Sequence, residues 1–245
     1  MKILLVNDDG INSQGIRALA NELEFNNDLT IVAPQQQMSG MGRSVTLHKG
    51  IKFDLDESYC VEAYAVNGTP TDCVKFAILH LGQKPDLLIS GINMGANTGT
   101  DIHYSGTVGA AMEGSFMGIP SIAISCCCNH GDKTFNYEYI AKFVKQNLLK
   151  LYKCVKPARV LNINVPNVGE KDIKGIKVVR QGQQDFQEFY EEVDGIYQLS
   201  PKINEIVKDM SDSDVKFMFE NFITITPLSH DLTDYERLTE LSGEF

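Results

Sequence analysis

The residues Asn7-Asp8-Asp9-Gly10 place two adjacent carboxylates directly after a short apolar run. Burying two unpartnered carboxylates costs a large desolvation free energy, so the pair must either stay solvated or share a cation. Oxygen ligands suit Mg²⁺, Mn²⁺ or Ca²⁺ better than zinc. The competing interpretation is an ordinary Asp-Gly turn that caps the following helix, and the dipeptide alone does not separate the two.

A second group of chemically capable residues lies between positions 90 and 107. The segment Ser90-Gly91-Ile92-Asn93-Met94-Gly95-Ala96-Asn97 follows an apolar run and is rich in glycine and asparagine. Amide side chains can ligate a metal or bind phosphate without adding charge. Ser105-Gly106-Thr107 then opens an expected helix, where hydroxyls and free N–H groups form an anion cradle. A long surface loop followed by an ordinary N-cap is the alternative.

Two further segments carry weaker signals. Residues 37–44, which include Ser39, form a polar, Gly-rich loop beside the expected loop of Asp8 and Asp9. Gly68-Thr69-Pro70-Thr71-Asp72-Cys73 has the composition of a helix start, with Thr69 or Thr71 as N-cap. We interpret this second segment as capping.

The elements that would position these residues alternate along the chain. Strand, helix and strand patterns at 2–7, 13–23 and 29–34 make a βαβ unit, which implies a right-handed crossover and a parallel sheet. Helices are expected at 71–81, 106–117 and 137–151, strands at 87–90, 121–125 and 159–165, and short strands within 44–66. The pattern predicts a doubly wound α/β sandwich that binds ligands at the carboxyl ends of its strands.

After Pro166 the composition changes. Residues 186–199 read as a hairpin that turns at Asp194-Gly195, and a last strand at 222–227 and a helix at 231–241 follow. The apolar side chains of the hairpin need another surface to cover them, which points to oligomerisation. These side chains are Phe186, Phe189, Tyr190, Ile196 and Tyr197. We expect one domain over residues 1–245, made of an α/β core (1–166) and a carboxyl-terminal oligomerisation part (167–245).

Composition narrows the function classes. Of 245 residues, 22 are Lys or Arg and 32 are Asp or Glu, a net charge of −10 that argues against a nucleic-acid duplex or an anionic membrane as partner. No apolar run approaches the roughly 20 residues that span a bilayer. The first apolar run ends at Asn7, which is too early for a signal peptide. The cysteines include no CxxC pair and are expected to be reduced, buried thiols. We therefore expect a cytoplasmic protein.

Three other chemistries each lack a central group. A receiver domain needs a phospho-accepting Asp after the third strand, where this chain has Ser90-Gly91-Ile92-Asn93. A haloacid-dehalogenase phosphatase needs Asp-x-Asp, and a Rossmann dehydrogenase needs a Gly-x-Gly-x-x-Gly turn. The five histidines show no zinc-like spacing, and only His103 draws interest, through its location.

Over essentially its whole length the chain resembles the SurE family of survival proteins, which are 5′-nucleotidases. Ordered motifs carry the resemblance: Ile3–Gly10, Val32-Ala33-Pro34 with Ser39-Gly40, Gly68–Val74, Ser90–Asn93 with Gly95 and Asn97, Tyr104–Val108 through Glu113-Gly114, Leu161–Pro166, and Ile225–Leu228. Gln14, Met94 and Cys126-Cys127-Cys128 depart from the family pattern, and Met94 lies where it would alter the rim of the site.

The resemblance implies a Rossmann-like three-layer sandwich that forms homodimers or homotetramers by exchanging carboxyl-terminal elements. It implies one divalent cation per subunit, Mg²⁺ or Mn²⁺, bound by Asp8, Asp9, the hydroxyl of Ser39 and the amide oxygen of Asn93. It also implies phosphate binding by Ser105, Gly106 and Thr107, with Asn97.

The expected activity is hydrolysis of nucleoside 5′-monophosphates, and also of 3′-monophosphates and short polyphosphate, by a metal-activated water with Asp8 or Asp9 as general base. A non-catalytic nucleotide-binding oligomer would share every motif and is the alternative. A purely structural oligomer built on the 186–199 hairpin is a third possibility.

Overall fold

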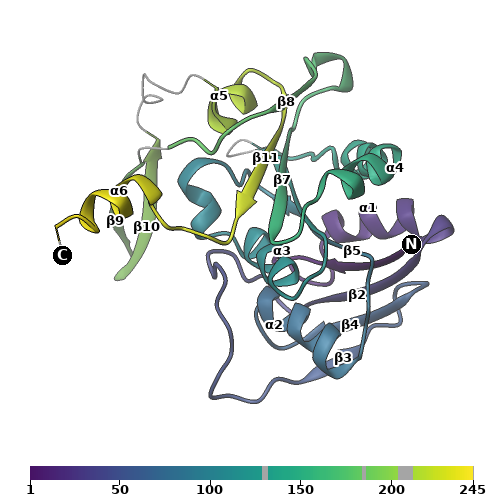
Figure 1. Ribbon diagram of the computed structural model, residues 1–245. Coiled ribbons are helices and arrows are strands. Elements are labelled where there is room, and N and C mark those ends of the chain that lie inside the picture. Colours follow the sequence, from purple (N-terminus) through teal and green to yellow (C-terminus); the bar gives the residue numbers. More distant parts are fainter. Residues whose placement is uncertain (129–131, 184–185, 204–211, 245) are drawn as a thin grey trace.

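The computed structural model describes residues 1–128, 132–183, 186–203 and 212–244. Within these ranges nine strands form one sheet in the order β3-β4-β2-β1-β5-β6-β7-β11-β8 (Figure 1). The six central strands run parallel: β1 (Lys2–Val6), β2 (Asp28–Pro34), β4 (Glu62–Val66), β5 (Leu87–Met94), β6 (Ser121–Cys127) and β7 (Arg159–Pro166). The predicted parallel α/β sheet is confirmed.

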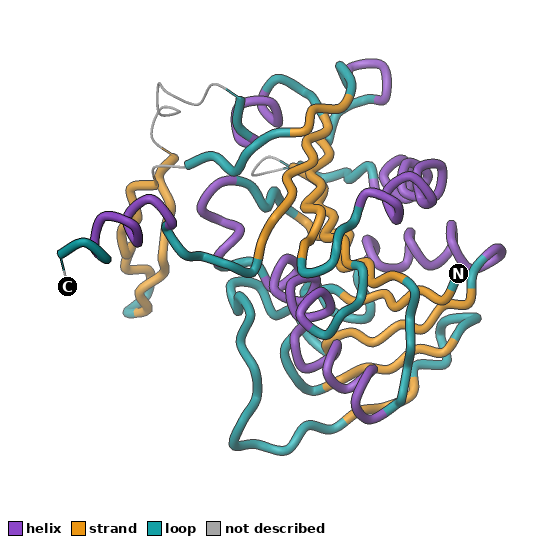
Figure 2. Tube along the Cα trace, viewed as in Figure 1, coloured by secondary structure: helices purple, strands orange, loops and turns teal. Residues whose placement is uncertain are grey.

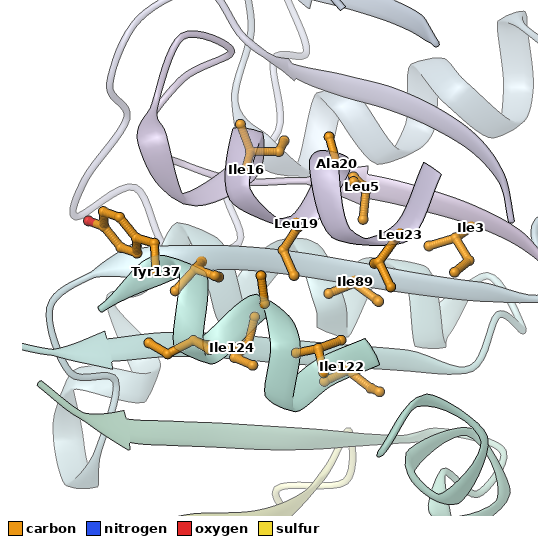
Figure 3. Packing of buried hydrophobic residues seen from close by; sticks show 14 of the residues in the cluster. Ile3, Leu5, Ile16, Leu19, Ala20, Leu23, Ile89, Ile122, Ile124 and Tyr137 are labelled. Carbon is orange, nitrogen blue, oxygen red and sulfur yellow. The ribbon is translucent and has the colours of Figure 1, made fainter. Parts of the chain in front are cut away.

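Helices cover both faces of this sheet and make three layers (Figure 2). Alternate residues of each strand face opposite sides, so Ile3 and Leu5 of β1 pack with α1 and α4, while Leu4 and Val6 pack with α2 and α3. Figure 3 shows Leu19 and Leu23 of α1 directed toward Ile89 of the sheet, and Ile16 belongs to the same buried cluster. The bounds are α1 (Gln14–Leu23), α2 (Pro70–Lys75), α3 (Gly106–Phe116) and α4 (Tyr137–Cys154).

Helix α1 lies directly on strand β5. A Cβ atom at Gly15 would come within 2.1 Å of the backbone oxygen of Ile92. Only glycine allows this approach, since a backbone oxygen cannot turn aside as a flexible side chain can. The close packing fixes the first helix over the strand that carries Asn93.

Several elements differ from the expected bounds. Strand β5 runs past Ser90 to Met94, because Asn93 and Met94 resume pairing with β6 after a register shift. The helix that begins at Pro70 continues as a π-helical turn over Phe76–His80. Thr69 caps α2 in a capping box with Asp72, which confirms the capping interpretation of this segment. Short elements that the periodicity did not reveal are η1 (Glu24–Asn26), η3 (Gly99–His103), η4 (Glu170–Asp172) and α5 (Asp214–Phe219).

The carboxyl-terminal part contributes both to the sheet and to a projecting arm. Strand β11 (Ile223–Ser229) pairs antiparallel with β7, β8 (Ile176–Val178) pairs with β11, and β3 (Phe53–Leu55) closes the other edge. The hairpin of β9 (Phe186–Val193) and β10 (Ile196–Ile203) projects from this body together with α6 (Tyr235–Leu241) (Figure 1). Its turn lies at Asp194-Gly195, as predicted, and both residues have positive φ. None of the described helices is both long and apolar enough to cross a membrane.

Candidate active site

Three loops that carry candidate residues lie at one edge of the sheet. Strands β2, β1 and β5 are neighbours, and each points its carboxyl end to the same side. Asp8 and Asp9 follow β1, Ser39 follows β2, and Asn93 lies near the end of β5. The topology therefore brings together residues that are up to 85 positions apart in the sequence.

Hydrogen bonds connect these loops around Asp9. The Nε2 atom of Gln37 lies 3.5 Å from Oδ1 of Asp9 and donates to Oγ of Ser39 at 3.0 Å. The backbone N–H of Met94, next to Asn93, donates to Oδ2 of Asp9 at 2.8 Å. Asn93 itself donates its amide nitrogen to the Gly95 carbonyl at 2.9 Å, which leaves its amide oxygen as the group able to ligate.

Asp8 is enclosed by the first turn of α3. Its side chain is 3 % exposed, and its Oδ1 accepts a hydrogen bond from the Thr107 hydroxyl. A Cβ atom at Gly106 would lie 2.8 Å from the Asp8 Cβ atom, so the helix terminus packs directly on this side chain. Burial raises the pKa of Asp8, and hydrogen bonds from the Thr107 hydroxyl and from the backbone of Thr107 and Gly106 oppose that rise.

Asp9 is more accessible than Asp8. Burial raises its pKa to about 6, the Met94 N–H lowers it, and the charge on Asp8 raises it further. Neither Asp8 nor Asp9 caps α1, since the N-cap residue of that helix is Ser13. The turn-and-cap alternative therefore does not account for the pair.

The composition of the site fits an oxygen-ligated divalent cation. Two adjacent carboxylates withdrawn from water favour a cation that neutralises both. In the described part of the chain, no three His, Cys, Asp or Glu side chains form a metal-binding group. A cation at Asp8 and Asp9 would therefore need neutral oxygens. Ser39, in the loop after β2, and Asn93, near the end of β5, lie next to the groups that contact Asp9.

The residues expected to bind phosphate all have partners within the protein. Ser105 caps α3 by accepting from the Val108 N–H at 3.1 Å, and Thr107 donates to Asp8. Asn97 donates its side-chain nitrogen to the hydroxyl of Ser125 at 2.8 Å. The Ser105 hydroxyl proton remains able to donate to a ligand. Thr107 here supports Asp8, and the phosphate-binding roles stay predictions.

Residues that belong to sequence motifs, but to which the sequence assigned no role in the site, hold this site in place. Asn162 and Asn164 of β7 are fully buried and bind the backbone of Asn97, and Gln37 joins Asp9 to Ser39. Two buried asparagines at alternate positions of an otherwise apolar strand were the available signal, because buried amides need dedicated partners. Gln37 is exposed, and only the weak signal of the polar, Gly-rich loop 37–44 pointed to it.

Ionic and polar contacts anchor the loop after β2 at residues that follow Ser39. Arg43 and Lys75 each approach the buried carboxylate of Glu113 to 2.7 Å. Thr46 donates its N–H and its hydroxyl to Asp72 at 3.0 and 2.6 Å. The motif residues Asp72 and Glu113 thus hold the loop that carries Ser39.

A cavity of about 820 Å³ lies beside α3, between that helix and β11. Ser105 and His103 line it, whereas Asp8 and Asp9 do not. The cavity therefore adjoins the candidate site without containing its carboxylates. His103 lies 3.4 Å from Gln181 through its ring nitrogen Nε2, and His130 lies outside the described residues.

The cysteines are free thiols with different exposures. Cys73, Cys126 and Cys127 are buried, Cys128 is partly buried, and Cys60 and Cys154 are exposed. The expectation of reduced, buried thiols is therefore wrong for Cys60 and Cys154, which lie on the surface.

Comparison with known proteins identifies the family of this chain. The profile of the family described as "Survival protein SurE" matches residues 3–188. A protein named 5′-nucleotidase SurE from Clostridium beijerinckii is 40 % identical over 253 residues, which cover 100 % of this chain and 99 % of the relative. The protein of the same name from Thermosipho africanus is 41 % identical over 256 residues and covers 100 % of this chain and 98 % of its own length.

A solved structure gives the same fold. The crystal structure of the SurE protein from Aquifex aeolicus superposes with a TM-score of 0.81 at 36 % sequence identity. The match covers 100 % of this chain and 99 % of that protein.

Proposed function

This chain belongs to the SurE family, and we propose that it is a 5′-nucleotidase that hydrolyses nucleoside 5′-monophosphates with the help of one divalent cation. The observation that carries the proposal is the Asp8-Asp9 pair. Asp8 is buried, and Asp9 is hydrogen-bonded to Gln37, which also bonds to Ser39, and to the backbone of Met94, which follows Asn93. Matched relatives bear the name 5′-nucleotidase, and the site has the polar groups that phosphate-ester hydrolysis needs.

The proposed ligands of the cation are Asp8, Asp9, Ser39 and Asn93, and Mg²⁺ or Mn²⁺ suits their oxygen atoms. A cation bound there would polarise the phosphate and lower the pKa of a bound water. Two carboxylates balance a dication, so the loaded site stays attractive to a dianionic phosphate.

The protein groups have separate tasks in this proposal. Asp9 is the better placed of the two carboxylates to accept a proton, since Thr107 and the first turn of α3 enclose Asp8. The Ser105 hydroxyl and the N-terminal turn of α3, with Gly106 and Thr107, would stabilise negative charge on the phosphate oxygens. Asn97 would assist from the preceding loop. Hydrolysis of 3′-monophosphates and short polyphosphate belongs to the same proposal.

The assembly and location are also proposed. A homodimer or homotetramer would cover the exposed apolar side chains of the projecting hairpin, which include Tyr190, Tyr197 and Leu199. A reducing cytoplasm suits a chain whose cysteines are free thiols.

The test is phosphate release from AMP and GMP by the purified full-length protein. EDTA should abolish release, and Mg²⁺ or Mn²⁺ should restore it. Asp9→Ala should lose activity, whereas Asp28→Ala, at the exposed start of β2, should keep it. Activity that survives in Asp9→Ala would contradict the assigned ligands. Nucleotide binding without turnover in the wild-type protein would favour the non-catalytic binder.

A further inference from the structure

The loop between Asn93 and α3 joins the two halves of the candidate site, and buried side chains hold its backbone at Asn97. Asn164 accepts the Asn97 N–H through Oδ1 at 2.8 Å. Asn162 and Asn164 both donate to the Asn97 carbonyl oxygen, at 2.7 and 3.0 Å. Because both asparagines are buried on strand β7, they fix this point of the loop to the centre of the sheet.

Two positions further along, the carboxyl-terminal part of the chain holds the same loop. The Gly99 N–H donates to Oδ2 of Asp214 at 3.2 Å, and the Gly99 carbonyl oxygen accepts from Nε2 of Gln181 at 2.8 Å. Oδ1 of Asp214 accepts from the N–H groups of Gly182 and Val215 at 2.7 and 2.8 Å. Gln181 and Asp214 bracket the hairpin in the sequence, so these contacts tie the base of that arm to the loop.

Asp214 is an unusual residue to bury. Its side chain is 0 % exposed, and removing a carboxylate from water costs several kcal/mol unless hydrogen bonds replace the lost hydration. Three backbone N–H groups supply that replacement. An asparagine at this position could not accept all three hydrogen bonds. Its NH₂ group would replace one of the two oxygens and would then face a backbone N–H donor. The arrangement therefore requires a carboxylate and specifies where Gly99 lies.

We propose that Asp214 and Gln181 are positioning residues for the active site: they fix Gly99, and with it the spacing between Asn93 and the first turn of α3. This inference rests on the proposed nucleotidase function. Hydrolysis requires the cation ligands and the phosphate-binding turn to keep a defined separation, and a displacement of about 1 Å at a reacting centre costs up to about 100-fold in rate.

The experiment compares Asp214→Asn with the matched control Asp212→Asn, an exposed carboxylate two residues away. Rates of AMP hydrolysis with saturating Mn²⁺ are measured at a temperature where both variants are fully folded. We expect kcat to fall about 10- to 100-fold in Asp214→Asn with KM within about threefold, and no change in Asp212→Asn. Gln181→Ala leaves no buried charge unpaired and should lower kcat by about threefold or more. This variant tests the proposal if Asp214→Asn does not fold.

Hydrogen exchange of the peptide that contains Gly99 gives a readout independent of catalysis. Faster exchange of this peptide in Asp214→Asn or Gln181→Ala, with exchange in Asp212→Asn unchanged, supports the positioning role. If the wild-type protein hydrolyses no nucleotide but this exchange result holds, only the proposed function fails. A lowered melting temperature with wild-type kcat and unchanged exchange at Gly99 in both variants overturns the proposal.

Discussion

At the scale of single residues, the environment of Asp8 differs from that of Asp9 although the two are neighbours in sequence. Thr107 donates to Asp8, whereas a backbone N–H and the amide of Gln37 approach Asp9. An outer hydrogen bond of this kind orients a metal-ligating carboxylate and favours its charged form. Thr107 should therefore matter to cation binding even though its hydroxyl is not among the proposed ligands.

Replacing Thr107 by Val should weaken Mn²⁺ binding about 10- to 100-fold, because the isosteric side chain cannot donate to Asp8 and the pKa of that carboxyl then rises further. Calorimetric titration of the purified variant with Mn²⁺ measures the loss. Thr107→Ser keeps the hydroxyl and should bind Mn²⁺ within a few-fold of the wild-type protein. An unchanged Mn²⁺ affinity in Thr107→Val together with a raised KM for AMP would show instead that Thr107 contacts the phosphate.

At the scale of elements, Glu113 of α3 joins that helix to α2 and to the loop after β2. Burial disfavours its charged form, but hydrogen bonds and attraction from Lys75 and Arg43 outweigh burial and lower the pKa of Glu113. Lys75 lies in α2, and Arg43 lies four residues after Ser39. The carboxylate therefore stabilises the position of a proposed ligand loop as well as the packing of two helices.

Glu113→Gln should lower the free energy of unfolding by about 2 kcal/mol near pH 7. The lowered pKa means that the wild-type advantage is present above the ordinary pKa of 4.5 and disappears as pH falls through the lower folded-state value. Urea unfolding of both proteins over a pH series measures this difference.

The exposed pair of Glu22 and Lys145 supplies the control for this prediction. Glu22→Gln should change stability by no more than about 1 kcal/mol, since water screens a surface pair. If the difference in free energy of unfolding between the wild-type protein and Glu113→Gln stays constant to the lowest pH measured, the electrostatic explanation is contradicted.

At the scale of the whole molecule, the hairpin projects from the sheet and leaves several apolar side chains exposed (Figure 1). Tyr190 of β9 lies opposite Leu199 of β10, so the two side chains share one face, and both are exposed. Ile196 and Val193 pair on the opposite face and are exposed as well. A two-stranded hairpin with apolar side chains on both faces is marginally stable in water and gains from being covered.

The double variant Tyr190→Ser/Leu199→Ser should shift the protein from a dimer or tetramer to a monomer, because it removes a cross-strand apolar pair from the proposed contact between copies. Light scattering coupled to gel filtration measures the mass, and circular dichroism shows whether the core stays folded. Gln198→Ser, on the other face of the same strand, should leave the mass unchanged. A wild-type protein that is already monomeric would exclude the proposed assembly.

Much of this molecule follows from its sequence alone. The apolar periodicities predicted the parallel α/β sandwich, and the strand-end positions of Asp8, Asp9, Ser39 and Asn93 predicted a shared edge, because parallel strands all end on the same side of a sheet. The hairpin and its Asp194-Gly195 turn were also predictable, since that turn demands positive φ. These features depend on local chain chemistry.

Tertiary structure decided which partner each polar group takes. Thr107 bonds to Asp8, Gln37 joins Asp9 to Ser39, and Asp214 holds Gly99 from 115 residues away. No local pattern encodes such pairs, because a buried hydrogen-bonding group is satisfied by whatever donor or acceptor the packed fold brings within reach. The sequence alone therefore determined the fold class and the position of the acidic pair at a strand end, whereas only the packed molecule decided which residues support that pair.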